Sequence, residues 1–297
     1  MNIFRHSAVI GIVAIGMGLV CLIGEIDLSV GSLLALDAGF GVVIFNMTGS
    51  IFVTLLFCLI FGGLLGALNG LLVGYVKMPA FIVTLSTMLI YRSLAQYFCQ
   101  QLPKNLIGGG SSVYKMDTKL GHFQALYNFG NGKLATVPVV GIVLIIMMIL
   151  FIYITNSTKF GKKIYAIGSN AKGALMTGIN VSGMTFTVFV LAGVMVGLAA
   201  FLWIAMNGSA DPATTGSSNE MYAIASVVLG GISMSGGRGK MVGVLFGAMS
   251  YTVIDKIIVA LKMNSLINDT IKGVILILVI LIQVAGPRIK QKLSKKA

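Results

Sequence analysis

The sequence predicts an all-α protein that crosses a membrane several times, and its composition, glycine content and segment lengths support this prediction. Hydrophobic residues make up 57% of the 297 residues and charged residues only 10%, with a mean hydropathy of +0.98. A soluble domain carries roughly a quarter charged residues. The 38 glycines are typical of closely packed membrane helices, because small residues let the backbones approach. We expect one transmembrane domain covering residues 1–297.

The chain contains about nine apolar segments, counted by the rule that roughly 20 apolar residues span a bilayer. The first, the second and the seventh are short or interrupted by glycine, so they could be half-helices rather than full spans. The segments lie near residues 6–23, 28–46, 51–76, 79–101, 138–156, 181–206, 220–235, 241–260 and 266–285.

Basic residues predict the orientation in the cell membrane. The net charge of +13 would suit a nucleic-acid-binding protein only as a basic face on a soluble domain, whereas here the lysines gather in loops and in the C-terminal tail. Because cytoplasmic loops are rich in Lys and Arg, we expect the tail 286–297, the loop 157–180, Arg238 and Lys240 in the cytoplasm. Counting back through the spans places Met1 outside, which suggests that a first helix is missing.

The sequence offers no metal centre, cofactor site or catalytic residue. Cys21, Cys58 and Cys99 lie singly in apolar stretches, without the CxxC or Cys/His spacing of metal sites. His6 and His122 are isolated in the sequence. We therefore expect cysteines that only pack as small hydrophobic residues and a protein that is not an enzyme.

An internal repeat interrupts two of the apolar regions. Residues 24–31 read Gly-Glu-Ile-Asp-Leu-Ser-Val-Gly, and the pattern returns at residues 230–237 as Gly-Gly-Ile-Ser-Met-Ser-Gly-Gly. Irregular backbone inside a membrane is tolerated only where protein or a water-filled path surrounds it, and broken helices in repeats are typical of transporters. The predicted gate residues are Gly24, Glu25, Asp27, Ser29 and Gly31 in the first copy and Gly230, Gly231, Ser235, Gly236, Gly237 and Arg238 in the second.

The two acidic residues of the first copy need an explanation, because loops on the cytoplasmic side are normally basic. One explanation is an ion pair with Arg238 and Lys240 of the second copy, which would lock the inner gate. Another is that a carboxylate caps the helix that starts at Leu28, a contribution of about 1 kcal/mol. We assign the cap to Asp27 and the gate pairing to Glu25.

Polar residues inside apolar segments are candidates for the substrate pathway, because charge at membrane depth is costly. Asp37 either faces a cavity or is the structural partner of a basic residue such as Arg92. Asn69, Thr84 and Thr87 offer neutral donors and acceptors that suit sugar hydroxyls, although Thr side chains also hydrogen-bond between helices for structural reasons.

Four stretches of the chain carry a resemblance to a known family. Residues 24–36 continue the first repeat as Gly-Glu-Ile-Asp-Leu-Ser-Val-Gly-Ser-Leu-Leu-Ala-Leu, which resembles the signature of the permease subunits of bacterial ribose, galactose and xylose ABC importers, where Gly usually replaces Glu25. Residues 79–88, 160–170 and 227–239 match further motifs of these subunits in the same order.

The resemblance implies a membrane-spanning permease that works with other proteins. Its partners would be a second permease copy or a paralogue, ATP-binding subunits in the cytoplasm and an extracytoplasmic sugar-binding protein. It would pass a monosaccharide inward by alternating access, surrounded by membrane lipid. Such permeases have about ten helices, and the count of spans suggests that this chain lacks the first.

The resemblance also identifies the element that docks into the ATPase. This coupling helix would cover residues 170–178, with Asn170 as a suitable N-cap and Gly178 as a C-terminal stop. The family usually has an acidic residue at the position of Ala171 and often Arg at that of Leu175, so the charge pattern of this contact differs here. The remaining predicted coupling residues are Lys172, Gly173 and Ala174.

Two other classes of protein remain open on the sequence alone. An ion-coupled secondary transporter would also have broken helices, and Glu25, Asp27 and Asp37 would be its relay. A structural membrane scaffold is the second class, but helices broken by glycine are poorly suited to a purely structural role. The chain lacks the Gly-x-x-x-x-Gly-Lys-Ser/Thr loop that cradles nucleotide phosphates, so ATP hydrolysis requires another polypeptide, and co-purification of such a subunit distinguishes the classes.

Overall fold

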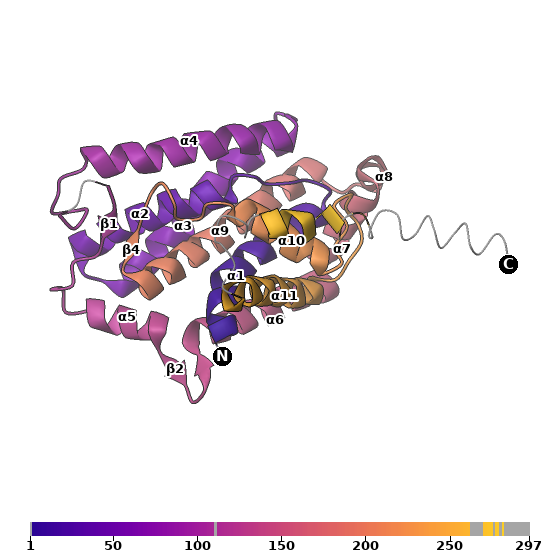
Figure 1. The fold of residues 1–297 in the computed structure, drawn as a ribbon. Helices are drawn as coiled ribbons and strands as arrows, with labels where there is room; N and C mark the ends of the chain where they lie inside the picture. Colours follow the sequence, from indigo (N-terminus) through magenta and orange to yellow (C-terminus); the bar gives the residue numbers. More distant parts are fainter. Residues whose placement is uncertain (1, 110–111, 262–269, 276, 279–280, 282–297) are drawn as a thin grey trace.

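A computed structural model describes residues 2–109, 112–261, 270–275, 277–278 and 281, and these residues form a helical protein with four very short strands (Figure 1). The strands form two antiparallel pairs, β1 (Tyr114–Lys115) with β4 (Ser209–Ala210) and β2 (Lys133–Leu134) with β3 (Val137–Pro138). The helices are α1 (Asn2–Leu22), α2 (Val30–Thr48), α3 (Ile51–Gly74), α4 (Ala80–Gln101), α5 (Phe123–Asn131), α6 (Val139–Ser157), α7 (Lys159–Ser169), α8 (Ala171–Met176), α9 (Val181–Asn207), α10 (Asn219–Leu229) and α11 (Met241–Ala260).

The predicted spans correspond closely to these helices. In the described part of the chain, α2, α3, α6, α9 and residues 241–258 of α11 are long and apolar enough to cross a membrane. The half-helix prediction is confirmed for the seventh segment, since α10 has 11 residues. It is wrong for the second, because α2 is apolar and has 19 residues, about the length of a span at 1.5 Å per residue. Helix α1 has 21 residues, but its apolar part, Ser7–Leu22, is shorter than a span. The ninth segment, 266–285, lies partly outside the described residues.

Helix α1 occupies the centre of the molecule. Its residues from Ala8 to Leu22 are almost all buried, because α6, α9, α10 and α11 pack around it. The approach to α9 is close, and a Cβ on Gly16 would lie 3.0 Å from Ala192 Cα. A helix that is apolar on all sides is expected in such a position.

The tightest helix pair is α3 with α9, and glycine makes it possible. Four glycines at four-residue intervals, Gly62, Gly66, Gly70 and Gly74, face α9. A Cβ on Gly70 would stand 2.9 Å from the carbonyl oxygen of Phe186, a distance that real Cβ atoms do not adopt. Such a stripe of small residues lets two membrane helices pack through their backbones.

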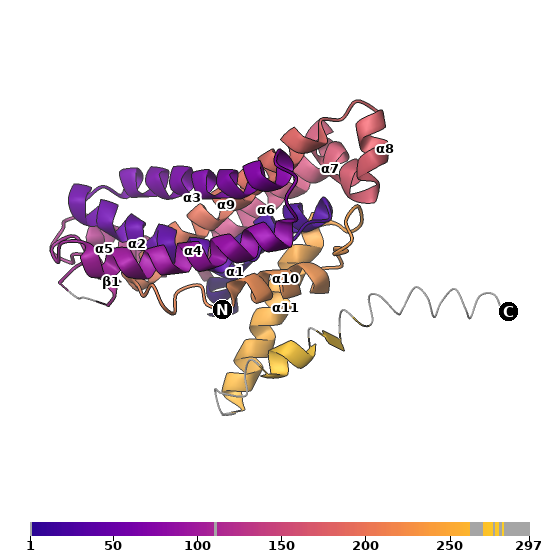
Figure 2. The ribbon, with the colours of Figure 1, turned by 90° about the horizontal axis from the view of Figure 1, so that it is seen from above.

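The molecule has two ends, which we name after the helices that lie there. Figures 1 and 2 both show α5 at one end and α8 at the other. Helix α1 starts at the α5 end, where the Arg5 guanidinium bonds to the Asn131 side chain of α5. Helix α9 runs in the opposite direction, because Asn131 also donates to the carbonyl oxygen of Met206 near its C-terminus, over 3.1 Å.

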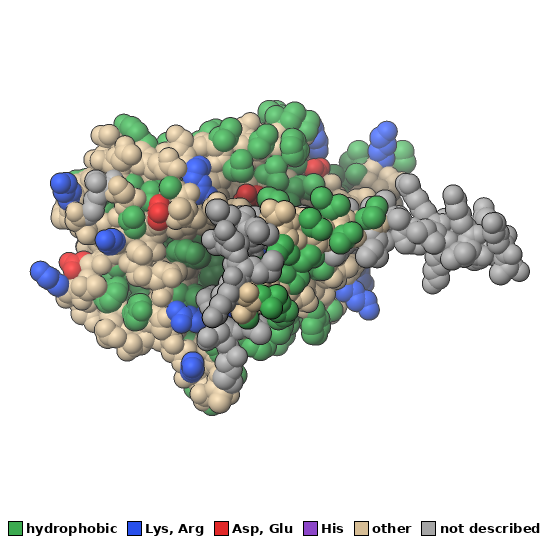
Figure 3. All heavy atoms as spheres, in the orientation of Figure 1, with side chains coloured by type: hydrophobic (Ala, Val, Ile, Leu, Met, Phe, Trp, Pro, Cys, Tyr) green, Lys and Arg blue, Asp and Glu red, His purple; other side chains and the backbone are tan. Residues whose placement is uncertain are grey.

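Charged and apolar side chains are distributed differently between the two ends and the region that joins them. Figure 3 shows Lys and Arg side chains chiefly around the ends of the molecule, with hydrophobic side chains over much of the remaining surface. Helix α4 lies on the outside, along α2 and α3 (Figure 1). It has 22 residues but is not among the helices that are apolar enough to span a membrane.

Candidate functional site

The first glycine break ends α1 at the α8 end of the molecule. Gly24 adopts a left-handed conformation with φ of 85°, and its N–H donates to the carbonyl oxygen of Cys21 over 2.9 Å. The N–H of Glu25 reaches back to Val20 over 3.1 Å. This is the hydrogen-bond pattern of a Schellman helix end, which favours glycine because a Cβ is strained at that φ.

The second break has the same geometry. Gly231 has φ of 81°, its N–H donates to Val228 over 2.9 Å, and the N–H of Ile232 donates to Val227 over 3.1 Å. Gly24 is therefore equivalent to Gly231 and not to Gly230, so the two copies align one residue away from the register that the sequence suggested.

The two breaks meet in space although they are far apart in sequence. The N–H of Gly237 donates to the carbonyl oxygen of Leu22, the last residue of α1, over 2.9 Å. A Cβ on Gly236 would lie 2.8 Å from the Gly24 nitrogen and 2.9 Å from Gly168 Cα in α7. Ser235 also approaches the first break, since its carbonyl oxygen would lie 3.5 Å from a Cβ on Gly24. We name this contact between residues 22–24, 235–237 and Gly168 the break junction.

A buried polar chain fixes the start of α2. Asp27 Oδ1 accepts the N–H of Ser29 over 2.8 Å and its hydroxyl over 2.6 Å. Asn69 of α3 donates to Ser29 Oγ over 2.9 Å. The predicted helix cap at Asp27 is not formed: Asp27 closes a turn onto Ser29, α2 begins at Val30 rather than Leu28, and its N-cap Ser29 makes no side-chain capping bond.

The predicted gate pair between Glu25 and Arg238 is not formed in this conformation. Among the described residues, the ion pair within 4.0 Å joins Lys272 and Asp255. The Glu25 carboxyl is half-buried, which raises its pKa, and the Lys77 ammonium opposes that rise. Lys77 therefore acts on Glu25 through its charge, without an ion pair within 4.0 Å, while Arg238 is exposed to solvent.

The last glycine of the first motif packs against the chain that leads into α10. A Cβ on Gly31 would overlap both the carbonyl oxygen of Gly216 and the Glu220 carboxylate. Gly216 itself has φ of 69°. The residues 211–218 therefore enter the helical layer at this point, between β4 and α10.

Arg92 holds this entering segment and does not contact Asp37. Its guanidinium donates to the carbonyl oxygens of Pro212 over 3.0 Å and Thr215 over 2.7 Å. Of the two alternatives for Asp37, the pairing with Arg92 is therefore wrong. Asp37 is fully buried beside the Cys58 thiol, at the place where α2 meets the glycine-lined contact of α3 with α9.

The other predicted pathway residues are also buried inside the protomer. Thr84 Oγ1 donates to its own helix at Ala80 over 2.8 Å and lies 3.4 Å from the carbonyl oxygen of Ile26 in the first break. Thr87 Oγ1 donates to Val83 over 3.1 Å. Both are positioned to brace helices, whereas Asn69 belongs to the polar chain of the break.

Sequence reasoning missed a polar stripe on the exposed face of α4. Ser86, Ser93, Gln96 and Gln100 are all exposed, and their spacing of seven, three and four residues places them along one side of a helix. A cavity of about 200 Å³ lies beside the stripe, lined by Gln96, Cys99, Gln100, Ser112, Pro212 and Ala213. The helical periodicity of these polar residues was the signal that could have revealed them.

The structure has a helix at the place predicted for the coupling helix, α8 at the tip of the molecule. Asn170 Oδ1 accepts the N–H of Gly173 over 2.9 Å, as an N-cap, and Gly178 ends the turn with φ of 81°. Ala174 is only 5% exposed, whereas Leu175 is 63% and Met176 is 88% exposed. Leu175 and Met176 therefore form an exposed apolar surface, while Ala174 packs inward. Ala171 and Lys172 are exposed on the same turn.

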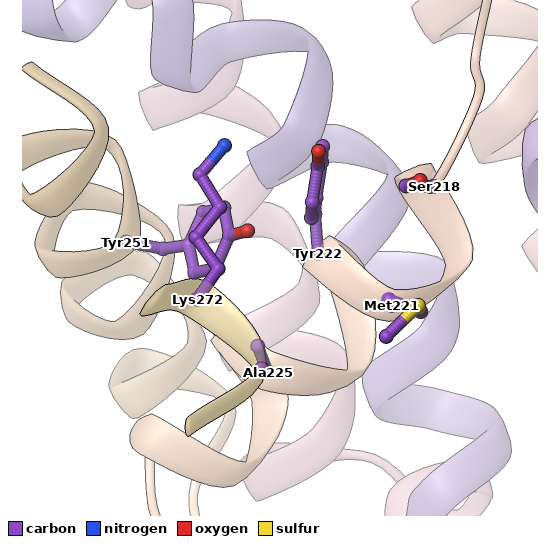
Figure 4. A pocket seen from close by; sticks show the side chains of 7 residues that line it. Ser218, Met221, Tyr222, Ala225, Tyr251 and Lys272 are labelled. Carbon is purple, nitrogen blue, oxygen red and sulfur yellow. The ribbon is translucent and has the colours of Figure 1, made fainter. Parts of the chain in front are cut away.

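A second polar cluster lies between α10, α11 and the helical residues 270–275. Lys272 pairs with Asp255 over 2.8 Å, and its ammonium lies 4.6 Å from the ring centre of Tyr222 and 5.5 Å from that of Tyr251. Figure 4 shows Lys272, Tyr222 and Tyr251 around a cavity of about 200 Å³. The acidic and basic groups satisfy one another, and no group of three His, Cys, Asp or Glu that could hold a metal ion is found in the described residues.

Comparison with known proteins gives consistent matches. A family model described as "Branched-chain amino acid transport system / permease component" matches residues 1–281. The ribose import permease protein RbsC of Bacillus subtilis is 35% identical over 284 residues, which cover 95% of this chain and 83% of that protein. RbsC of Escherichia coli is 33% identical over 282 residues, which cover 95% of this chain and 84% of that protein.

A relative named for a different substrate matches almost as well. The autoinducer 2 import system permease protein LsrC of Yersinia pseudotuberculosis is 32% identical over 284 residues, which cover 93% of this chain and 74% of that protein. No solved structure matched the chain. The family match over residues 1–281 and the identities to three curated permeases show that this multi-pass membrane protein belongs to the family of branched-chain amino acid transport system permease components.

Proposed function

We propose that the chain is the membrane-spanning subunit of an ATP-driven importer that passes a monosaccharide, ribose or a related sugar, from a binding protein to the cytoplasm. The observation that carries this proposal is the combination of α8 with the break junction. A protruding, capped helix with exposed Leu175 and Met176 is suited to dock into a separate ATPase. The junction of two broken helices supplies an element that can change conformation.

The polar stripe of α4 supports a transport route along that helix. The Ser86 hydroxyl donates to the carbonyl oxygen of Ile82 over 2.8 Å, but a side-chain amide without a partner is costly in lipid. Gln96 and Gln100, which line the cavity beside α4, therefore indicate a surface that meets water or protein. We infer that a second permease copy or a paralogue faces α4 and that sugar passes between them. The buried residues Asp37, Asn69, Thr84 and Thr87 then act as supports behind the route.

We place the α8 end in the cytoplasm, together with the C-terminus. Helices α7 and α8 carry Lys159, Lys162, Lys163 and Lys172, all exposed, and cytoplasmic surfaces of membrane proteins are enriched in such residues. The binding protein would then dock at the α5 end. Labelling a cysteine at Lys172 from the cytoplasmic side only, and one at Lys119 from the opposite side only, is the expected result.

Uptake into proteoliposomes tests the function. The chain is reconstituted with its ATPase subunit and binding protein, and the uptake of radiolabelled ribose, galactose, xylose and autoinducer 2 is measured with and without ATP. We expect ATP-dependent uptake of a sugar and retention of the ATPase during purification. Uptake driven by a proton or sodium gradient without ATP would instead support the ion-coupled secondary transporter.

A further inference from the structure

Helix α7 is amphipathic and lies between the candidate coupling helix and the break junction. Thr158 Oγ1 caps its start by accepting the N–H of Gly161 over 3.2 Å. Ile164 and Ile167 are buried, whereas Lys162 and Lys163 are exposed. This division fixes which face of α7 rests on the helical core.

Helices α7 and α8 follow each other without a linker. Asn170 ends α7, with its N–H donating to Ala166 over 3.0 Å. The same residue starts α8, where its side chain accepts the N–H of Gly173. Because a single residue belongs to both helix ends, a displacement of α8 is transmitted directly to the end of α7.

The end of α7 touches both copies of the repeat through backbone. A Cβ on Gly168 would overlap the carbonyl oxygen of Leu22 and the nitrogen of Gly237, which are the two partners of the hydrogen bond between the breaks. The main chains of α7, of the end of α1 and of the second break therefore meet at Gly168. No flexible side chain lies between them that could move aside for an added methyl group.

A second contact attaches α7 to the loop of the second break. The Tyr165 hydroxyl donates to the carbonyl oxygen of Gly239 over 2.9 Å. That loop is itself closed, because the N–H of Ser233 donates to the carbonyl oxygen of Arg238 over 3.0 Å. The loop is thus held to α7 at two points, Gly168 and Tyr165.

We propose that α7 is the lever that carries movement of α8 to the break junction, with Gly168 and Tyr165 as the positioning residues that attach it. The inference rests on the proposed function and deepens it. It names the elements through which ATP hydrolysis would move the break junction at the end of α1. Rigid elements that shift as a unit are a usual means of such transmission. A methyl group at Gly168 separates α7 from both breaks and uncouples the two events.

The test compares Gly168→Ala, Tyr165→Phe and Gly121→Ala in the complete complex of permease, ATPase and binding protein. Gly121 is the control, because a Cβ there meets no atom within 4 Å. For each variant, retention of the ATPase, the rate of ATP hydrolysis and the uptake of ribose are measured. The decisive quantity is the number of sugar molecules moved per ATP hydrolysed, which a merely less stable complex would not change.

Gly168→Ala is expected to retain the ATPase and hydrolyse ATP while moving about tenfold less sugar per ATP. Tyr165→Phe keeps the ring and loses one hydrogen bond, so a smaller loss of about two- to fivefold is expected. If the Gly168→Ala permease does not assemble with the ATPase, the sugar moved per ATP by Tyr165→Phe decides the test. A ratio equal to that of Gly121→Ala in the assembled variants overturns the lever. The proposed function fails separately, if the unmodified complex neither retains an ATPase nor moves a sugar.

Discussion

Asn69 of α3 donates to Ser29 Oγ over 2.9 Å, and this hydrogen bond ties the first break to a helix that begins at the opposite end of the molecule. Ser29 passes the connection on to Asp27. All three residues are buried, so the loss of one partner leaves a polar group unsatisfied. Such a loss costs about 1–3 kcal/mol.

Replacing Asp27 tests this polar chain. Asp27→Ala removes the acceptor of two hydrogen bonds, and we expect the free energy of unfolding to fall by about 1–3 kcal/mol. Asp27→Asn keeps an oxygen at Oδ1 and should lose less than half as much. Thermal unfolding of the purified protein in detergent measures both variants. Equal unfolding temperatures for the two variants would show that the carboxylate does not act as an acceptor here.

A charge exchange tests which cation acts on Glu25. Glu25→Lys places a second positive charge near Lys77, so sugar uptake should fall by about two- to tenfold. Adding Lys77→Glu restores the opposite charges and should recover part of the uptake. The matched double variant Glu25→Lys with Arg238→Glu should recover none, because Arg238 is exposed and unpaired with Glu25 in this structure. If Arg238→Glu restores uptake to Glu25→Lys and Lys77→Glu does not, the gate pair predicted from the sequence is favoured instead.

The contact of Gly31 predicts a strong effect of one methyl group. Gly31→Ala forces the added Cβ into Gly216 and Glu220, and overpacking of this kind costs about 1–3 kcal/mol. We expect a lower unfolding temperature and less uptake than in Gly121→Ala, where the added Cβ meets open space. Comparable values for the two variants would mean that residues 211–218 can move away without cost.

The exposed tip of α8 predicts a defect in assembly rather than in folding. Leu175→Asp with Met176→Asp adds charge to an apolar surface, and the loss of a hot-spot residue at an interface costs about 2 kcal/mol or more. We expect normal insertion but loss of the ATPase during purification. Leu134→Asp is the control, since Leu134 is 69% exposed at the other end of the molecule. Ala174 is unsuitable for this test, because it is buried and its substitution would disturb α8 itself.

Local features of the site were predictable from the sequence. Asn170 and Gly178 bound α8 as expected, because an N-cap and a left-handed glycine act on the adjacent backbone. Gly24 and Gly231 end their helices for the same reason. The predicted alignment of the two copies was wrong by one residue. The sequence pattern matches Gly24 with Gly230, whereas the hydrogen bonds of the turn match Gly24 with Gly231.

Contacts between distant segments were not predictable. One of the two alternatives for Asp37 was a pairing with Arg92, because both are charged within apolar segments. Instead α2 directs Asp37 toward α3 and α9, whereas Arg92 binds the carbonyl oxygens of Pro212 and Thr215. Glu25 likewise lies near Lys77. The partner of a charge depends on the depth and rotation of whole helices, which no single segment encodes.

By itself, the sequence determined that this chain is a helical membrane protein with broken segments and a capped protruding helix, because hydropathy, glycine and capping residues act over a few neighbouring positions. Only the tertiary structure decided that the two breaks touch and that Gly168 joins them to α7. The physical reason is that these contacts are made by backbone atoms at helix crossings. A glycine has no side chain, so the sequence shows that a close approach is possible there but not which segment makes it. That segment is determined by the packing of all the surrounding helices.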